Sequence, residues 1–180
     1  MPRYVALLRG INLGARNRVS MPELRELLEG HGYRDVATLV QSGNVVLTSR
    51  ASAARLERDL QRQIAEGLGV DTPVIVRTRE ELAAVVERDP LGSVADDPKR
   101  YQVTFLAEEP DEDAARELAE ADVAPERIEL IGRELYTWHP DGIRRSKADR
   151  LRTSKRLPAG TARNWRTVTS LLELADGETP

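Results

Sequence analysis

Hydrophobic residues follow two spacings along the first 78 residues, and each spacing predicts one type of element. Short apolar runs bounded by turn residues indicate buried strands, and four such runs cover Tyr4–Arg9, Val36–Val40, Val45–Thr48 and Val74–Arg77. Two further segments place apolar residues at helical spacing, and these residues are Leu24, Leu27 and Leu28, then Ala53, Leu56, Leu60, Ile64 and Leu68. The chain therefore begins with the order strand, helix, strand, strand, helix, strand.

Local signals mark where the first two helices begin and end. Residues 20–23 (Ser-Met-Pro-Glu) form a capping box with proline in the first turn. Glycines 30 and 32 end this first helix, and glycines 67 and 69 end the second. The order of the elements is that of the ferredoxin-like fold. The sequence thus predicts an α+β protein with a ferredoxin-like first lobe, made of an antiparallel sheet, over residues 1–78.

The pattern continues beyond residue 78 without a linker-like segment. A second capping box, Thr78–Glu81, starts a third helix. The remaining expected elements are a strand over Tyr101–Ala107, an acidic helix over Pro110–Ala121, a hairpin of Arg127–Ile131 and Glu134–Trp138, a basic helix over Ile143–Lys155, and a last helix from about Asn164. Residues 79–180 are therefore expected to form a smaller α+β second lobe with basic C-terminal helices. A weak duplication of the first lobe is compatible with this order, although the two halves share no aligned motif.

Composition changes this picture by excluding several classes of protein. The 180 residues are 40% hydrophobic and 32% charged, which indicates a globular chain. Cysteine is absent, so disulfides, thiolate nucleophiles and cysteine-bound metals are excluded, and two histidines make a histidine-rich metal site unfavourable. No apolar run reaches the roughly 18 residues of a membrane span, and the N-terminus lacks the features of a signal peptide. We expect a cytoplasmic protein with no membrane partner, no metal and no cofactor.

Charge is distributed unevenly along the chain. Residues 1–21 contain four arginines and no acidic residue, and residues 141–166 contain nine cations against two acidic residues, within a net charge of −3. Both ends are thus basic and the middle is acidic. Such an asymmetry can mark an anionic partner, although charged stretches often face only water.

The predicted topology brings two polar segments together. In ferredoxin-like sheets the strand order is 4-1-3-2 with antiparallel neighbours, so strand 1 ends beside the turn that joins strands 2 and 3. The loop Arg9–Gly14 and the turn Gln41–Asn44 should therefore lie side by side. Backbone N–H groups in glycine-containing turns and a following helix N-terminus favour anions, and Arg9 and Arg16 supply charge. Glycine and asparagine are equally explained by turn geometry alone.

The C-terminal third adds a second set of candidates. Ser146 and Lys147 lie within the expected basic helix, and Arg163 and Asn164 lie at the expected start of the last helix. An asparagine at such a position is commonly an N-cap, and Trp165 is typical of a core position. His139, which follows a strand, lacks a partnering Ser, Asp or Glu pattern and is a weak catalytic candidate.

Four motifs in register resemble one known family. They are Arg9–Gly14 after the first strand, Gln41–Val45, the stretch from Tyr136 to Gly142 followed by Ser146-Lys147, and Thr161–Val168. Together they resemble the bacterial family called domain of unknown function 1697 over nearly the whole chain. The resemblance implies a two-lobed α+β fold with a ferredoxin-like first lobe, and it implies no established reaction. Residues 148–158 are richer in arginine than the family pattern.

These observations lead to a candidate site and leave three classes of function open. We expect a phosphate-bearing small molecule or a nucleic acid to bind between the two lobes, facing residues of both. The candidate binding residues are Arg9, Gly10, Asn12, Gly14, Gln41, Ser42, Gly43, Asn44, Ser146, Lys147, Arg163 and Asn164. The alternatives are an enzyme that acts on a small anionic substrate, with Lys147, Tyr136 or His139 as acid or base, and a protein-interaction module without catalysis.

Overall fold

The computed structural model describes residues 1–178, and these residues form six helices and two four-stranded antiparallel sheets. They group into two compact units, which are unit 1 (residues 1–84 and 169–178) and unit 2 (residues 85–168). The chain leaves unit 1 within α3 (Arg79–Arg88) and returns within α6 (Trp165–Ala175). The lobe boundary that the sequence places at residue 78 stays a prediction. The division into compact units falls inside α3, after residue 84.

Unit 1 holds the first sheet and two long helices. Its elements are β1 (Arg3–Leu8), α1 (Met21–Gly30), β2 (Arg34–Leu39), β3 (Asn44–Thr48), α2 (Ala53–Leu68) and β4 (Val74–Thr78). The sheet order is β2-β3-β1-β4 with every neighbouring pair antiparallel, which is the strand order that the sequence predicted. Each predicted strand and helix of this segment is present, with bounds shifted by one or two residues.

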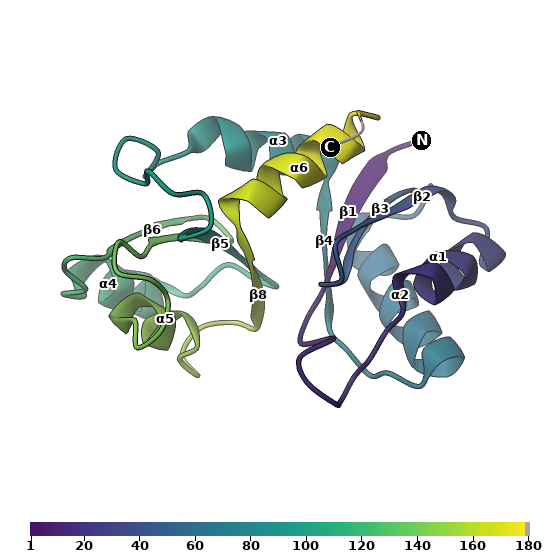
Figure 1. Ribbon diagram of the computed structural model, residues 1–180, viewed down its shortest axis with the longest axis horizontal. Helices are drawn as coiled ribbons and strands as arrows, with labels where there is room; N and C mark the ends of the chain where they lie inside the picture. The colour runs from purple at the N-terminus through teal and green to yellow at the C-terminus, as the bar shows by residue number, and fades with distance from the viewer. Residues whose placement is uncertain (179–180) are drawn as a thin grey trace. The chain divides into compact units, whose positions relative to one another are not determined.

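Helices α1 and α2 lie against one face of this sheet (Figure 1). The core between them contains alternate residues of β1, such as Tyr4, Ala6 and Leu8, together with Leu24 of α1 and Leu60 of α2. The opposite face of the sheet is buried as well, and its fully buried side chains include Val5, Val46 and Arg77.

The helix starts of unit 1 follow the capping signals. Ser20 accepts a hydrogen bond from the amide of Glu23, and Ser52 accepts one from the amide of Arg55. At the start of α3, Thr78 and Glu81 exchange two hydrogen bonds of 2.8 and 3.0 Å between backbone and side chain. The two capping boxes predicted at residues 20–23 and 78–81 are therefore confirmed in position. At residues 78–81 the two side chains each bond to the other residue's backbone amide, as in a complete capping box.

Unit 2 repeats the element order of unit 1. Its elements are β5 (Tyr101–Leu106), α4 (Glu112–Glu120), β6 (Arg127–Ile131), β7 (Glu134–Trp138), α5 (Lys147–Arg152) and β8 (Gly160–Asn164), followed by the start of α6. The sheet order is β6-β7-β5-β8, again antiparallel throughout. The predicted hairpin around Gly132 has the bounds that the sequence indicated.

Two expectations for the C-terminal segment were wrong, and one strand was not expected. The basic helix does not cover residues 143–155, because Arg145 has a left-handed φ of 66° and Ser146 caps α5, which then ends at Arg152. Strand β8 was not expected, because its residues alternate without a hydrophobic pattern and it forms by pairing with β5. Helix α6 is not basic, since it contains one arginine and one glutamate.

Candidate functional site

Residues 9–14 and 41–44, called the paired loops below, lie side by side in unit 1, as the sequence predicted. The Nδ2 amide of Asn12 donates to the backbone oxygen of Gln41 at 2.7 Å. The same side chain closes its own loop, because Oδ1 accepts from the amide of Val19 at 2.9 Å and Nδ2 donates to the oxygen of Val19 at 3.0 Å. Asn12 therefore fixes the first loop and joins it to the turn.

The turn packs tightly against the end of β1. Gly43 has a φ of 73°, and a Cβ placed on it would lie 2.7 Å from side-chain atoms of both Ile11 and Leu8. The oxygen of Gly43 accepts from the amide of Leu8 at 2.9 Å. Glycine is thus required here both by its left-handed backbone and by the close approach.

The backbone of the first loop alternates in handedness. Gly10, Asn12 and Gly14 have φ values of 65°, 56° and 80°, whereas Ile11 and Leu13 between them have negative φ. Alternation of this kind is found in nests, where successive backbone N–H groups turn toward one side and bind anions. The amide of Asn12 already donates to the backbone oxygen of Asn17 at 3.0 Å, so an anion site in this loop would use the N–H groups of the residues beside Asn12.

Positive charge surrounds this backbone. Arg9 and Arg16 are exposed, and within residues 1–178 neither guanidinium has a hydrogen bond or an ion pair. Arg18 donates from Nε to the oxygen of Gly14 at 3.3 Å. Because the first acidic residue of the chain is Glu23, the loop has no carboxylate of its own. Arg9 and Arg16 are free to pair with an external anion.

Asn44 differs from the other residues of the turn. It is fully buried, and its Nδ2 donates to the backbone oxygen of Leu39 at 3.0 Å. This amide serves its own hairpin, while Gln41 and Ser42 are exposed. A role for Asn44 in ligand binding stays a prediction, and its visible contact is structural.

In unit 2, Ser146 and Lys147 start helix α5. Ser146 is buried, and its Oγ accepts from the amide of Asp149 at 2.9 Å, which makes it the N-cap. Lys147 is exposed and donates from Nζ to the oxygen of Ala124 at 3.2 Å. These two adjacent residues thus face different surroundings, one inside the unit and one at its surface.

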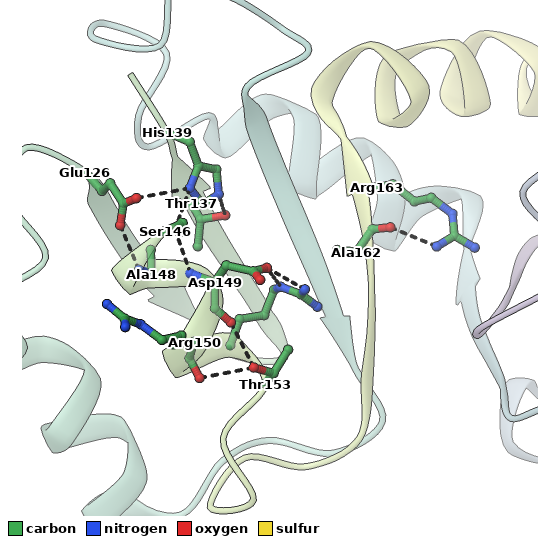
Figure 2. A network of polar contacts seen from close by, with 11 residues as sticks. Glu126, Thr137, His139, Ser146, Ala148, Asp149, Arg150, Thr153, Ala162 and Arg163 are labelled. Carbon is green, nitrogen blue, oxygen red and sulfur yellow. Dashed lines mark hydrogen bonds and ion pairs between the residues drawn. The ribbon is translucent and has the colours of Figure 1, made fainter. Parts of the chain in front are cut away.

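Ser146 belongs to a buried polar cluster around His139, shown in Figure 2. The Nδ1 atom of His139 lies 3.0 Å from Oγ of Ser146 and 3.7 Å from Oε1 of Glu126, and Nε2 lies 3.0 Å from Oγ1 of Thr137. The other carboxylate oxygen of Glu126 accepts from the amide of Ala148 at 2.7 Å. The cluster therefore ties the first turn of α5 to strands β6 and β7.

Burial governs the protonation of this histidine. His139 is almost completely buried, and burial lowers its pKa, while the carboxylates of Glu126 and Asp149 act in the opposite direction. The neutral ring satisfies both neighbouring hydroxyls, since one ring nitrogen donates and the other accepts. Sequence reasoning missed Glu126, which stands in no motif, and it did not single out Thr137 within the Tyr136–Gly142 stretch, because only the fold brings these two side chains to His139.

The geometry of the cluster differs from that of a hydrolytic triad. In a triad the nucleophile and the carboxylate contact opposite nitrogens of the imidazole, whereas Ser146 and Glu126 both approach Nδ1 of His139. Tyr136 is equally enclosed, because its hydroxyl donates to the oxygen of Val85 at 3.1 Å and burial raises its pKa to about 12. Of the three acid–base candidates, only Lys147 is exposed.

Arg163 and Asn164 occupy the end of β8. Arg163 is buried, donates to Oγ1 of Thr161 at 2.6 Å and to the oxygen of Ala162 at 2.8 Å, and burial lowers its pKa to about 10. Asn164 accepts from the amide of Thr167 at 2.9 Å, which confirms the expected N-cap of α6. Trp165, expected in the core, is half-buried and stacks on Tyr101 with ring centroids 4.6 Å apart.

The candidate residues therefore form two separate sets of contacts. The paired loops form one set within unit 1, and residues 146–147 and 163–164 belong to unit 2. That one ligand uses both sets stays a prediction. Within residues 1–178 no group of three or more His, Asp or Glu side chains is placed to hold a metal ion. No helix in the same part of the chain is long and apolar enough to cross a membrane.

The fold defines a protein of two α+β units that share one strand order. Residues 1–136 match the family model described as protein of unknown function, DUF1697, so the chain belongs to this family. The motifs around Ser146 and Thr161 lie beyond the matched residues. No curated protein matches the chain.

A solved structure has the same fold. The conserved bacterial protein SP0830 from Streptococcus pneumoniae is 24% identical to this chain, with a TM-score of 0.78. The alignment covers 97% of this chain and 98% of that one. At this level of identity the likeness establishes the arrangement of the elements and leaves the function to be argued from the site.

Proposed function

We propose that this protein binds a phosphate-bearing small molecule at the paired loops of unit 1. The observation that carries the proposal is the combination at one loop of a backbone with alternating handedness and unpaired arginines. Asn12 holds that backbone in place before any ligand arrives, so little ordering would be required on binding. Arg9 offers a guanidinium with no acceptor within residues 1–178.

The proposed contacts divide between backbone and side chains. Gly10, Gly14 and Gly43 supply N–H groups that face an anion without a Cβ, and Arg9 pairs with the phosphate. Gln41 and Ser42 add exposed polar side chains. The unit 2 candidates, Ser146, Lys147, Arg163 and Asn164, stay predicted ligand contacts and form no part of the site proposed at the paired loops. No cofactor or metal takes part in this proposal.

A small molecule is favoured over a nucleic acid by the placement of the aromatic residues. Single-stranded nucleic acids are usually bound by stacking of bases on exposed aromatic rings. All seven aromatic residues of this chain lie within residues 1–178, and none of them is exposed. The paired loops therefore offer phosphate contacts without a stacking platform.

The same proposal includes the class of the fold. Unit 1 has the element order β-α-β-β-α-β and a sheet in the order β2-β3-β1-β4. Both features support classing it as ferredoxin-like. The paired loops then lie at the end of the sheet that holds the C-terminal end of strand β1.

Calorimetric titration of the wild-type protein and the Arg9→Gln variant tests whether a phosphate compound binds and whether Arg9 contributes to its affinity. We expect the wild-type protein to bind a mononucleotide or inorganic phosphate, and Arg9→Gln to bind it about tenfold or more weakly, as for loss of a charge-assisted hydrogen bond. Arg58→Gln is the matched control, because Arg58 is an exposed arginine of α2. Titration with a DNA duplex at two salt concentrations separates the alternative, because nucleic-acid binding weakens steeply with salt. The proposal is wrong if no phosphate compound binds, or if both variants lose affinity equally.

The competing view is that the paired loops only hold each other together. Asn12→Ala addresses it, since removal of this side chain breaks hydrogen bonds to Gln41 and Val19. We expect a loss of about 1–3 kcal/mol in the free energy of unfolding without any ligand. Arg9→Gln should leave that free energy unchanged, so a binding defect in Arg9→Gln cannot be attributed to structural damage.

A further inference from the structure

A second concave site lies in unit 1 at the opposite end of the sheet from the paired loops. Its volume is about 540 Å³, which is within the range of small-molecule sites. The cavity is lined by the turn between α1 and β2, the end of β3, and the start of α2. The cavity and the turn at residues 41–44 lie at opposite ends of strand β3, whose length is about 14 Å at the usual rise per residue of a strand.

Three arginines from three elements line this cavity. Arg34 begins β2, Arg50 follows β3, and Arg55 lies in the first turn of α2. All three are exposed, so none contributes to the hydrophobic core. Arg34 and Arg50 have no side-chain hydrogen bond or ion pair within residues 1–178.

The two acidic residues Asp35 and Asp59 have contacts other than Arg34 and Arg50. Asp59, which also lines the cavity, lies 3.3 Å from Nε of Arg55 and 2.9 Å from a guanidinium nitrogen of Arg62. The carboxylate of Asp35 accepts a hydrogen bond of 2.9 Å from Oγ1 of Thr48. Asp59 is thus engaged by Arg55 and Arg62, and within residues 1–178 neither Asp35 nor Asp59 pairs with Arg34 or Arg50, so an external anion can pair with these two guanidiniums.

We propose that this arginine cavity, formed around Arg34, Arg50 and Arg55, binds the phosphate group of a small molecule. Guanidinium groups match phosphate oxygens with two parallel hydrogen bonds, and two unpaired guanidiniums balance one phosphate dianion. The half-buried ring of Tyr33 also lines the cavity and provides an apolar wall beside the phosphate. This site does not depend on the paired loops, because it shares no residue with them.

The test is a titration of ¹⁵N-labelled protein with inorganic phosphate and then with a mononucleotide, followed through backbone amide signals. Binding in the arginine cavity should shift the amides of Gly32, Ser49 and Arg50. Binding at the paired loops should shift those of Gly10 and Gly43 instead. The two sites are thus read separately in one experiment, and failure at one does not obscure the other.

Two double variants decide the assignment. Arg34→Gln/Arg50→Gln should raise the dissociation constant read at the cavity amides by about tenfold or more, as expected for loss of two charge-assisted contacts. Arg58→Gln/Arg127→Gln removes the same charge from exposed arginines that do not line the cavity, and it should leave that constant within about twofold. All four positions are exposed, so the variants should fold normally, as a thermal melt will check. Equal weakening in both variants, or no shift of the cavity amides in the wild type, would overturn the proposal.

Discussion

Val40 holds the least favourable backbone conformation near the paired loops. Its φ of 50° is left-handed, although its side chain is β-branched and 56% exposed. A β-branched residue in this region costs about 1–3 kcal/mol. The turn between β2 and β3 imposes the conformation, because Asn44 and Leu39 pair directly behind it. The strain is local to this turn, and most of the Val40 side chain is exposed to solvent.

Val40→Asn should therefore stabilise the protein. We expect the free energy of unfolding to rise by about 1 kcal/mol, because asparagine tolerates left-handed backbone and little packing is lost. Urea denaturation measures the change. Val94→Asn is the matched control, since Val94 is 45% exposed without a positive φ and should change stability by less than about 0.5 kcal/mol. Equal effects at the two positions would contradict the strain argument.

His139 makes the stability of the protein dependent on pH in the acidic range. Burial lowers its pKa in the folded state, so below the ordinary value of about 6.5 the unfolded chain takes up a proton that the folded chain does not. The contribution is complete above that pH, and the free energy of unfolding falls as the pH drops below it. We expect His139→Gln to reduce this slope between about pH 5 and 7. An NMR titration in which the His139 ring protonates at or above pH 6.5 would contradict this prediction.

Among the elements, those with local signals were predicted and those without were not. Helix α3 was predicted because Thr78 and Glu81 are three residues apart and cap its first turn. Strand β8 was missed because Gly160–Asn164 has no hydrophobic alternation, and its position depends on hydrogen bonds to β5. Helix α5 was predicted too long because a run of arginines resembles a solvated helix face, whereas the backbone turns at Arg145.

Strand β8 depends on a close approach at its first residue. A Cβ on Gly160 would lie 2.8 Å from Cδ2 of Leu106, 2.9 Å from Cγ2 of Thr104 and 3.0 Å from the backbone oxygen of Phe105. Gly160→Ala should therefore cost about 1–3 kcal/mol of stability, as other overpacked sites do. Gly30→Ala is the control, because a Cβ there meets nothing within 4 Å and alanine favours the helix. A thermal melt that shows equal stability for the two variants would exclude this packing account.

On the scale of the whole molecule, the two units repeat one topology with different interiors. Arg77 pairs with Val5 at the edge of the first sheet, and Arg163 pairs with Val103 at the corresponding edge of the second. The sequence suggested only a weak duplication, because the shared property is strand order and not residue identity.

The interiors explain why no common motif was visible. Leu47 and Thr137 correspond, because each is the residue before the last in its strand, β3 and β7 respectively. The position of Ala6 on β1 corresponds to that of Thr104 on β5. Unit 2 therefore has polar side chains where unit 1 has apolar ones, and hydrophobic patterns alone could not align them. The paired loops were predictable from topology, whereas the cluster around His139 required the folded structure.

The segment of α6 that belongs to unit 1 should carry part of the global stability. Leu171 is fully buried, and the guanidinium of Arg3 donates to the backbone oxygen of Leu174 at 3.1 Å. We expect Leu171→Ala to lower the free energy of unfolding by about 2–5 kcal/mol, as for other buried leucines. Glu173→Ala, an exposed change in the same helix, should have little effect. A loss below about 1 kcal/mol for Leu171→Ala would show that the segment is dispensable.

The division of unit 1 between two stretches of the chain sets an order of events during synthesis. Unit 2 is continuous in sequence, so it can fold as soon as residue 168 has left the ribosome. Unit 1 begins to emerge first but lacks residues 169–178 until unit 2 has been made. We therefore expect the strands of unit 1, which are made first, to lack the contacts of residues 169–178 while the chain is still on the ribosome. The unit that is translated first is then completed last.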